Sequence, residues 1–175
     1  MTGQQKPLSR RKVFGAGATF LASSGALTAV GTHRAESAQQ SPIPGEGWRA
    51  VVGKIGSPEF AAAFAKDPVL KASVMNRECR GVESIAAFFG ATRQMYDTLA
   101  FTRETVSGVR TYFEWEGRFL GEDAAGLTIL TRDEDGLIKQ VEIFHRPLQV
   151  VARFSKELGK RVAGKLDDSL FEPPG

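Results

Sequence analysis

Histidine and cysteine, two side chains often used in acid–base and nucleophilic catalysis, are rare in this 175-residue chain. The sequence contains two histidines and one cysteine: His33, His145 and Cys79. His145 is the best candidate, because an imidazole titrates near neutral pH and can act as a general acid or base when a partner fixes its tautomer. Glu104 is the nearest plausible carboxylate partner. The alternative is that His145 is a hydrogen-bonded structural residue at the end of a strand.

The remaining reactive groups do not indicate a second kind of chemistry. Cys79 has no histidine close to it in sequence and no CxxC motif, so we expect no redox or thiol-nucleophile role for it. A lone cysteine also rules out an internal disulfide. His33 lies in an N-terminal leader, which leaves one histidine and one cysteine, too few for a zinc site. No glycine-rich phosphate loop follows a predicted strand, and we expect no metal or cofactor.

His145 lies at the end of the last of three predicted antiparallel strands. Each strand is rich in β-branched and aromatic residues, and the second turn closes with Asp-Gly, the strongest short hairpin signal. The predicted strands are 109–120, 124–132 and 137–146, separated by turns at 121–123 and 133–136. Because strand side chains alternate between faces, one apolar wall is expected on one side of the sheet. Its members are Phe113, Trp115, Thr128, Leu130, Val141, Ile143 and His145.

Other segments of the chain supply the helices that cover this sheet. Ser57 as N-cap and Pro58 at the first helical position begin a helix that must end before Pro68. A stripe of apolar side chains predicts a long helix over 82–99 with Tyr96 on its inner side. The further elements expected are a short helix at 48–54, strands at 69–75 and 101–106, and a final helix beginning at Pro147.

Helices on one face of a curved antiparallel sheet predict an α+β domain. This order of elements resembles the nuclear transport factor 2-like (NTF2-like) superfamily, which includes SnoaL-like polyketide cyclases and ketosteroid isomerases. The resemblance covers about residues 48–160 and depends on three stretches, 64–70, 81–89 and 135–148. It implies a cone-shaped sheet, packed by three helices, around an apolar pocket. It also makes a homodimer a reasonable expectation.

The residues required for steroid isomerisation are missing at the positions that the resemblance indicates. Ala72 stands where those enzymes carry their carboxylate base, and Thr128 stands where they carry an acidic oxyanion donor. The resemblance therefore does not carry that reaction over to this chain. The candidate catalytic residue is His145, and the candidate ligand-binding residues are Tyr96, Phe113, Trp115, Thr128 and Ile143. For Phe113 and Trp115 plain core packing is the alternative, and for Tyr96 it is a buried hydroxyl bonded to the backbone.

Two functional hypotheses follow. In the first, the domain binds a small hydrophobic molecule in the pocket, with or without transforming it, and His145 carries the proton. A pocket smaller than the ~300 Å³ typical of ligand sites would count heavily against any small-molecule role. In the second, the domain is a non-catalytic binding or assembly module that forms a dimer. Tyr112, Ile129 and Phe144, on the outer face of the sheet, would then supply the apolar contacts.

The N-terminal segment accounts for the basic character of the chain. Residues 1–38 contain five basic residues and one acidic residue, leaving 18 basic and 19 acidic residues in the rest. The folded part is therefore nearly neutral, and we expect no nucleic-acid partner. Arg10 and Arg11 precede a mildly apolar run, a pattern typical of a twin-arginine export signal. We expect a signal at 1–38, a linker at 39–47, the domain at 48–164 and a disordered tail at 165–175. The protein should be exported to the periplasm or the exterior, with membrane contact only during export.

Overall fold

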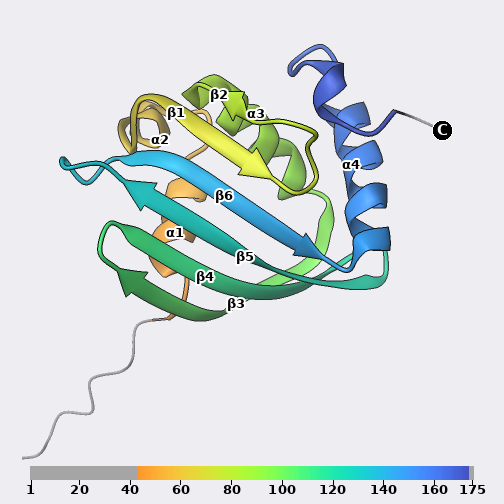
Figure 1. The fold of residues 1–175 in the computed structure, drawn as a ribbon, viewed down its shortest axis with the longest axis horizontal. Coiled ribbons are helices and arrows are strands. Elements are labelled where there is room, and N and C mark those ends of the chain that lie inside the picture. The colour runs from red at the N-terminus through yellow and green to blue at the C-terminus, as the bar shows by residue number, and fades with distance from the viewer. Residues whose placement is uncertain (1–42, 174–175) are drawn as a thin grey trace, which may run out of the picture. The chain divides into compact units, whose positions relative to one another are not determined.

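The structure is a computed structural model, and it describes residues 43–173. The predicted export signal (1–38) and residues 39–42 of the predicted linker lie outside the described residues. The described residues form four α-helices, six strands and a short 3₁₀ helix, and the arrangement of the helices and strands is drawn in Figure 1. In chain order these are α1 (Glu46–Gly53), α2 (Pro58–Ala62), β1 (Phe64–Ala72), β2 (Cys79–Arg80), α3 (Val82–Thr92), β3 (Tyr96–Ser107), β4 (Arg110–Phe119), β5 (Glu122–Arg132), β6 (Ile138–Arg146), α4 (Leu148–Val162) and η1 (Asp168–Leu170).

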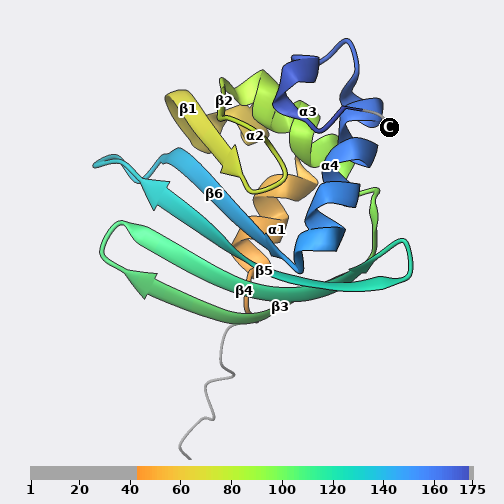
Figure 2. The ribbon, with the colours of Figure 1, turned by 45° about the vertical axis from the view of Figure 1, so that its right-hand side comes forward.

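The six strands form one curved sheet in the order β2-β1-β6-β5-β4-β3. Neighbouring strands run antiparallel except for β1 and β6, which are parallel. The sheet is therefore mixed, and the expectation of a purely antiparallel sheet is wrong at this pair. Helices α1, α3 and α4 lie on one side of the sheet, inside its curve (Figure 2). The α+β prediction is confirmed, with four α-helices rather than three.

The three-strand meander is present with bounds close to those predicted. The turn between β5 and β6 is held by Asp133, whose Oδ1 accepts hydrogen bonds from the backbone N–H groups of Asp135 and Leu137. Gly136 has a φ of 80°, a conformation that glycine adopts without a Cβ clash. These local contacts explain why the Asp-Gly signal located the hairpin correctly.

The predicted long helix is wrong over its last third. Helix α3 ends at Thr92, and strand β3 begins at Tyr96, which pairs with Phe119 of β4. Residues 96–99 carry apolar side chains at spacings that fit either a helix or a strand. They form a strand because β3 pairs with β4 along its whole length. Tyr96 therefore projects from a strand rather than from a helix.

The inner face of the sheet and the inner sides of the helices form the core. The predicted wall is confirmed by register: Phe113 pairs with Thr128, which pairs with Ile143, and Leu130 pairs with Val141. All five side chains are buried. They pack against aromatic residues of the helices, namely Trp48, Phe60, Phe88, Phe89 and Phe154.

The segment after α4 is ordered, so the prediction of a disordered tail is wrong up to residue 173. Leu170 and Phe171 are buried in the core. Arg77 donates to Asp167 Oδ2 at 2.5 Å and to Ser169 Oγ at 2.7 Å. The segment thus lies between α4 and the β1–β2 turn. None of the described helices is long and apolar enough to cross a membrane.

Candidate functional site

A small apolar cavity lies between the inner face of the sheet and helices α1 and α3. Its volume is about 110 Å³. Most of its surface comes from aromatic and aliphatic side chains, and no carboxylate lines it. The lining residues are Trp48, Arg49, Val52, Phe88, Phe89, Thr92, Arg93, Tyr96, Leu99, Phe101, Trp115, Thr128, Ile143 and His145. This volume is below the ~300 Å³ typical of ligand sites, which counts against the predicted small-molecule role and leaves no room for a molecule as large as a steroid.

One polar pair lies in this apolar lining. His145 Nε2 is 3.0 Å from the Tyr96 hydroxyl oxygen, a hydrogen-bond distance that joins β6 to the start of β3. The other ring nitrogen, Nδ1, is 3.2 Å from Ser73 Oγ. Ser73 Oγ also accepts a hydrogen bond from the His145 backbone N–H at 2.9 Å. Both nitrogens of the imidazole are thus hydrogen-bonded, one toward the cavity and one toward the exposed residue Ser73.

Aromatic packing fixes the plane of the imidazole. Its centroid is 5.1 Å from that of Trp115, in an edge-to-face arrangement, and 5.3 Å from that of Phe154. Gly126 lies between Trp115 and His145 in the sheet register. A Cβ at this position would lie 2.2 Å from the Trp115 ring and 2.1 Å from the Phe144 carbonyl oxygen. The absence of a side chain at Gly126 is therefore what lets the Trp115 ring lie close to its backbone.

Burial keeps both members of the polar pair uncharged at neutral pH. Desolvation lowers the pKa of His145 to about 4, because the apolar surroundings disfavour the imidazolium. Desolvation also raises the pKa of Tyr96, because a phenolate would be poorly solvated there. A neutral imidazole carries one donor and one acceptor nitrogen. The pair can therefore offer a ligand a hydrogen-bond donor or an acceptor, depending on the tautomer.

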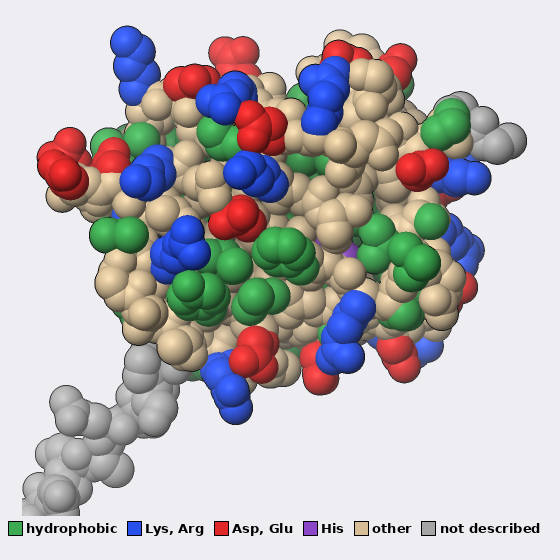
Figure 3. Space-filling model, in the orientation of Figure 1, with side chains coloured by type: hydrophobic (Ala, Val, Ile, Leu, Met, Phe, Trp, Pro, Cys, Tyr) green, Lys and Arg blue, Asp and Glu red, His purple; other side chains and the backbone are tan. Residues whose placement is uncertain are grey.

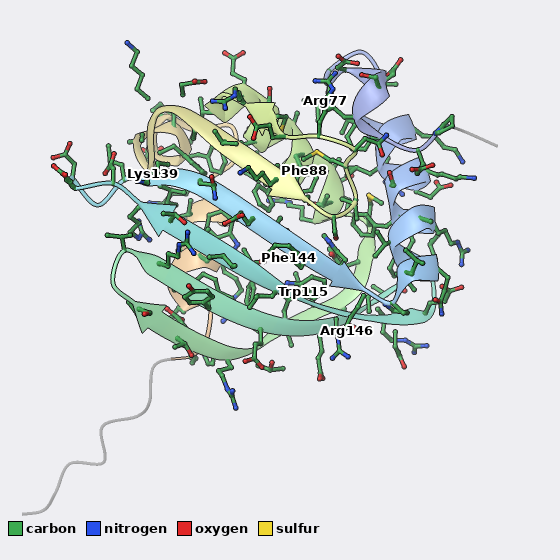
Figure 4. All side chains as sticks on the ribbon, in the orientation of Figure 1. Arg77, Phe88, Trp115, Lys139, Phe144 and Arg146 are labelled. Carbon is green, nitrogen blue, oxygen red and sulfur yellow. The ribbon has the colours of Figure 1, made fainter. Side chains whose placement is uncertain are left out.

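Five of the six predicted site residues line this cavity: Tyr96, Trp115, Thr128, Ile143 and His145. Phe113 does not, because its ring packs against Phe101 with centroids 5.5 Å apart. Trp115 and Phe88 lie on the cavity side of the sheet, whereas Phe144 projects from the opposite face (Figure 4).

The expected polar partner of His145 is wrong, and one of the two alternatives for Tyr96 is not observed. Glu104 does not contact His145: its Oε2 accepts a hydrogen bond from the Gly45 backbone N–H at 2.9 Å. The hydroxyl of Tyr96 contacts His145 and not the backbone. Sequence reasoning also missed Ser73, because it follows β1 and approaches His145 only through the parallel pairing of β1 with β6. No local pattern in the sequence marks that contact.

Cys79 and Ala72 are both buried and have no polar role at the cavity. Burial raises the pKa of the Cys79 thiol to about 11, so it is protonated at neutral pH. Ala72 pairs with Ile143 at the end of β1. The position that carries a base in ketosteroid isomerases is therefore a methyl group packed in the core.

No protein-family model matches this chain, and no curated protein matches it at a significant level. Solved structures do match. A steroid delta-isomerase from Pseudomonas aeruginosa superposes with a TM-score of 0.61 at 18% identity, covering 67% of this chain and 88% of its own. An uncharacterised bacterial protein with a cystatin-like fold from Silicibacter pomeroyi gives a TM-score of 0.60 at 24% identity, covering 66% and 82%. At these identities the likeness concerns the fold alone.

The described residues share their α+β fold with these neighbours, and the sequence resemblance implied a fold of this kind. In this chain the inner side of that fold holds an aromatic cavity with one hydrogen-bonded histidine–tyrosine pair.

Proposed function

We propose that the domain binds a small, mostly apolar molecule in this cavity and holds its single polar group against the Tyr96 hydroxyl. The observation that supports this proposal is the contact of 3.0 Å between Tyr96 and His145 in a lining that is mostly apolar. The cavity volume of about 110 Å³ limits the size of the guest. A cavity of ~150 Å³ accepts benzene, so the enclosed part of the ligand has about four to six heavy atoms.

The role proposed for His145 is that of a proton carrier behind Tyr96. In the tautomer with hydrogen on Nε2, Tyr96 gives its proton to a ligand oxygen and takes the Nε2 proton. Nδ1 then takes the proton of Ser73, which is exposed and regains one from water. Each group gives one proton and takes one, so no buried charge is left in the relay. The ligand oxygen gains one proton and solvent water loses one, so this is the general-acid half of an enolisation or isomerisation. To complete the reaction, the hydroxide left in the solvent must take the proton from the carbon next to the carbonyl, because no carboxylate lines the cavity.

The two tyrosines of the chain provide a matched test of binding. We expect 2-pentanone, a neutral ketone of six heavy atoms, to bind with a dissociation constant raised about fivefold to tenfold in Tyr96→Phe, because the ligand oxygen loses its donor. Tyr112→Phe, on the outer face of the sheet, should bind it unchanged. Ligand-observed NMR titration measures both. Failure of the ketone to bind, or equal binding by the two variants, would contradict the proposal.

The proton-carrier role needs a separate measurement. Deuterium exchange at the carbon next to the ketone carbonyl, followed by NMR in D₂O, should be faster with the protein than without it. His145→Gln should abolish the acceleration and leave binding in place, since glutamine keeps a polar side chain. Retained acceleration in that variant would reduce the proposal to binding alone.

The outer face of the sheet supports a second candidate function, self-association. Phe144 is 50% exposed and projects from that face (Figure 4), where hydrophobic side chains gather among charged ones (Figure 3). Tyr112, Leu127 and Ile129 lie beside it on β4 and β5. Sedimentation equilibrium should show a dimer for the wild-type protein. Phe144→Glu should dissociate this dimer. Val106→Glu, which changes another exposed apolar residue near the end of β3, should leave it intact. A monomeric wild-type protein would contradict this proposal.

Export by the twin-arginine pathway remains a proposal from Arg10 and Arg11. Replacing both with lysine should stop secretion, because that pathway reads the arginine pair. Replacing Lys6 and Lys12 with arginine is the charge-matched control. Secretion of the lysine variant at the wild-type level would rule the pathway out.

A further inference from the structure

Two arginines lie on the rim of the cavity, where they are out of place in a site for a neutral ligand. Arg49 of α1 and Arg93, just after α3, both line the cavity, and both are exposed. The residues deeper in the lining, among them Phe88, Trp115 and Thr128, are buried. The exposed members therefore mark the mouth, and the buried ones mark the interior.

Neither arginine has an acidic partner among the described residues. The eight ion pairs found in residues 43–173 involve other side chains. Glu46 lies one turn before Arg49 on α1, yet the two form no ion pair. Two acids near this end of the molecule are engaged elsewhere: Glu104 accepts from the Gly45 N–H at 2.9 Å, and Asp97 accepts from the Gly121 N–H at 2.8 Å.

Arg49 is also held in place over the mouth. Its guanidinium carbon lies 5.7 Å from the centroid of the Phe101 ring, a cation–π contact with another residue of the lining. A guanidinium stacked on an aromatic ring keeps its N–H donors free for an anion. The mouth of an aromatic cavity thus carries two cations whose hydrogen-bonding capacity is unused within the described part of the chain.

We infer that the ligand is a short carboxylic acid with a keto or hydroxyl oxygen at its far end. This inference rests on the proposed function and adds the carboxylate to it. The carboxylate would lie between Arg49 and Arg93, a geometry that arginine recognises with paired hydrogen bonds. The carbon chain would fill the aromatic cavity, and the oxygen would reach Tyr96. The volume of about 110 Å³ limits the enclosed chain to about four to six heavy atoms.

The test compares 4-oxopentanoate with its primary amide by isothermal titration calorimetry at pH 7.5, using the full chain. The acid and the amide have the same length and the same ketone and differ in charge. We expect the acid to bind about threefold to tenfold more tightly, since two exposed cations act on it in water. Raising the salt concentration to about 0.5 M should reduce this preference, because screening weakens exposed charge pairs. Binding of 4-oxooctanoate should be no tighter, since the cavity has no room for its longer chain.

Arg49→Gln and Arg93→Gln should each reduce the preference for the acid over the amide, and the double variant should remove that preference. Arg103→Gln is the control, because Arg103 is exposed on β3 but pairs with Glu114 at 3.3 Å and does not line the cavity. Equal binding of acid and amide by the wild-type protein, or an undiminished preference in the double variant, would overturn the inference and leave the proposed function standing. If 4-oxopentanoate, its amide and 2-pentanone all fail to bind, the proposed function itself is refuted.

Discussion

The two faces of the central sheet are built from the same strands but differ in how far their side chains are buried and in how their polar groups are paired. On the inner face most side chains of β4, β5 and β6 are buried, and the polar His145 there is within hydrogen-bond distance of Tyr96. On the outer face charged residues pair in solvent, as Arg103 does with Glu114 and Arg118 with Asp123. Phe144 is the exception on that face, since half of it is exposed.

This difference indicates where each kind of residue matters. An apolar side chain on the inner face contributes the free energy of removing its surface from water and of packing against neighbours. An exposed ion pair on the outer face contributes little, because water and salt screen it. Stability should therefore depend on the inner face, and association with other molecules on the outer face and the cavity mouth.

The largest effect we expect is on the free energy of unfolding when one phenylalanine on each face is separately replaced with alanine. Phe113 is 3% exposed on the inner face, and Phe144 is 50% exposed on the outer face. Phe113→Ala should lower the free energy of unfolding by about 3–5 kcal/mol, because it leaves a cavity in the core. Phe144→Ala should lower it by about 1 kcal/mol or less. Urea denaturation measures both, and similar losses would mean that the two faces do not differ as described.

The next effect is a pH dependence that arises from the inner face. The pKa of His145 is lowered to about 4 in the fold, whereas the unfolded chain should titrate near 6.5. Between these values the unfolded state binds more protons than the folded state, so stability falls as the pH drops from about 6.5 to 4. Because part of this residue remains accessible, we expect a loss of about 2 kcal/mol over this range.

Two histidine variants isolate this contribution. Urea denaturation at pH 7.5, 6.5, 5.5 and 4.5 should give a flatter profile for His145→Gln than for the wild type, since glutamine does not titrate. His33→Gln, which removes the other histidine of the chain, should keep the wild-type profile. If His145→Gln and the wild type lose stability in parallel, the acid sensitivity comes from other groups.

A third effect tests the close packing beside His145. Gly126→Ala places a methyl group against the Trp115 ring and the Phe144 carbonyl, so we expect a loss of about 1–3 kcal/mol. Gly90→Ala is the matched control, because its Cβ would meet only Ile55, at 4.0 Å. Alanine within helix α3 should be neutral or stabilising there. Thermal unfolding of the two variants gives the contrast, and a tolerated Gly126→Ala would mean that the Trp115 ring has room to move.

The sequence predicted the parts of this architecture that depend on local signals. The Asp133–Gly136 turn and the alternation of β4, β5 and β6 located the inner wall, including Thr128, Ile143 and His145. The sequence-based prediction failed where pairing between distant segments determines the local structure. Residues 96–99 fit a helix by spacing but pair with β4, and the C-terminal segment becomes ordered because Leu170 and Phe171 reach the core. The sequence also did not predict the partners of His145, because Tyr96 and Ser73 lie on segments that are far from it in the chain.

The smallest effect concerns Ser73, the residue through which the imidazole reaches the exterior. Ser73→Ala removes the acceptor for the His145 backbone N–H and the contact with Nδ1, so we expect a loss of about 0.5–1.5 kcal/mol in unfolding free energy. Ser107→Ala should be neutral, because the Ser107 side chain is exposed and has no hydrogen bond within residues 43–173. The decisive measurement is the ¹⁵N chemical shifts of the His145 ring, which report the balance of its two tautomers. Ser73→Ala should change that balance while Ser107→Ala leaves it alone, and unchanged shifts in both would mean that Tyr96 by itself fixes the tautomer.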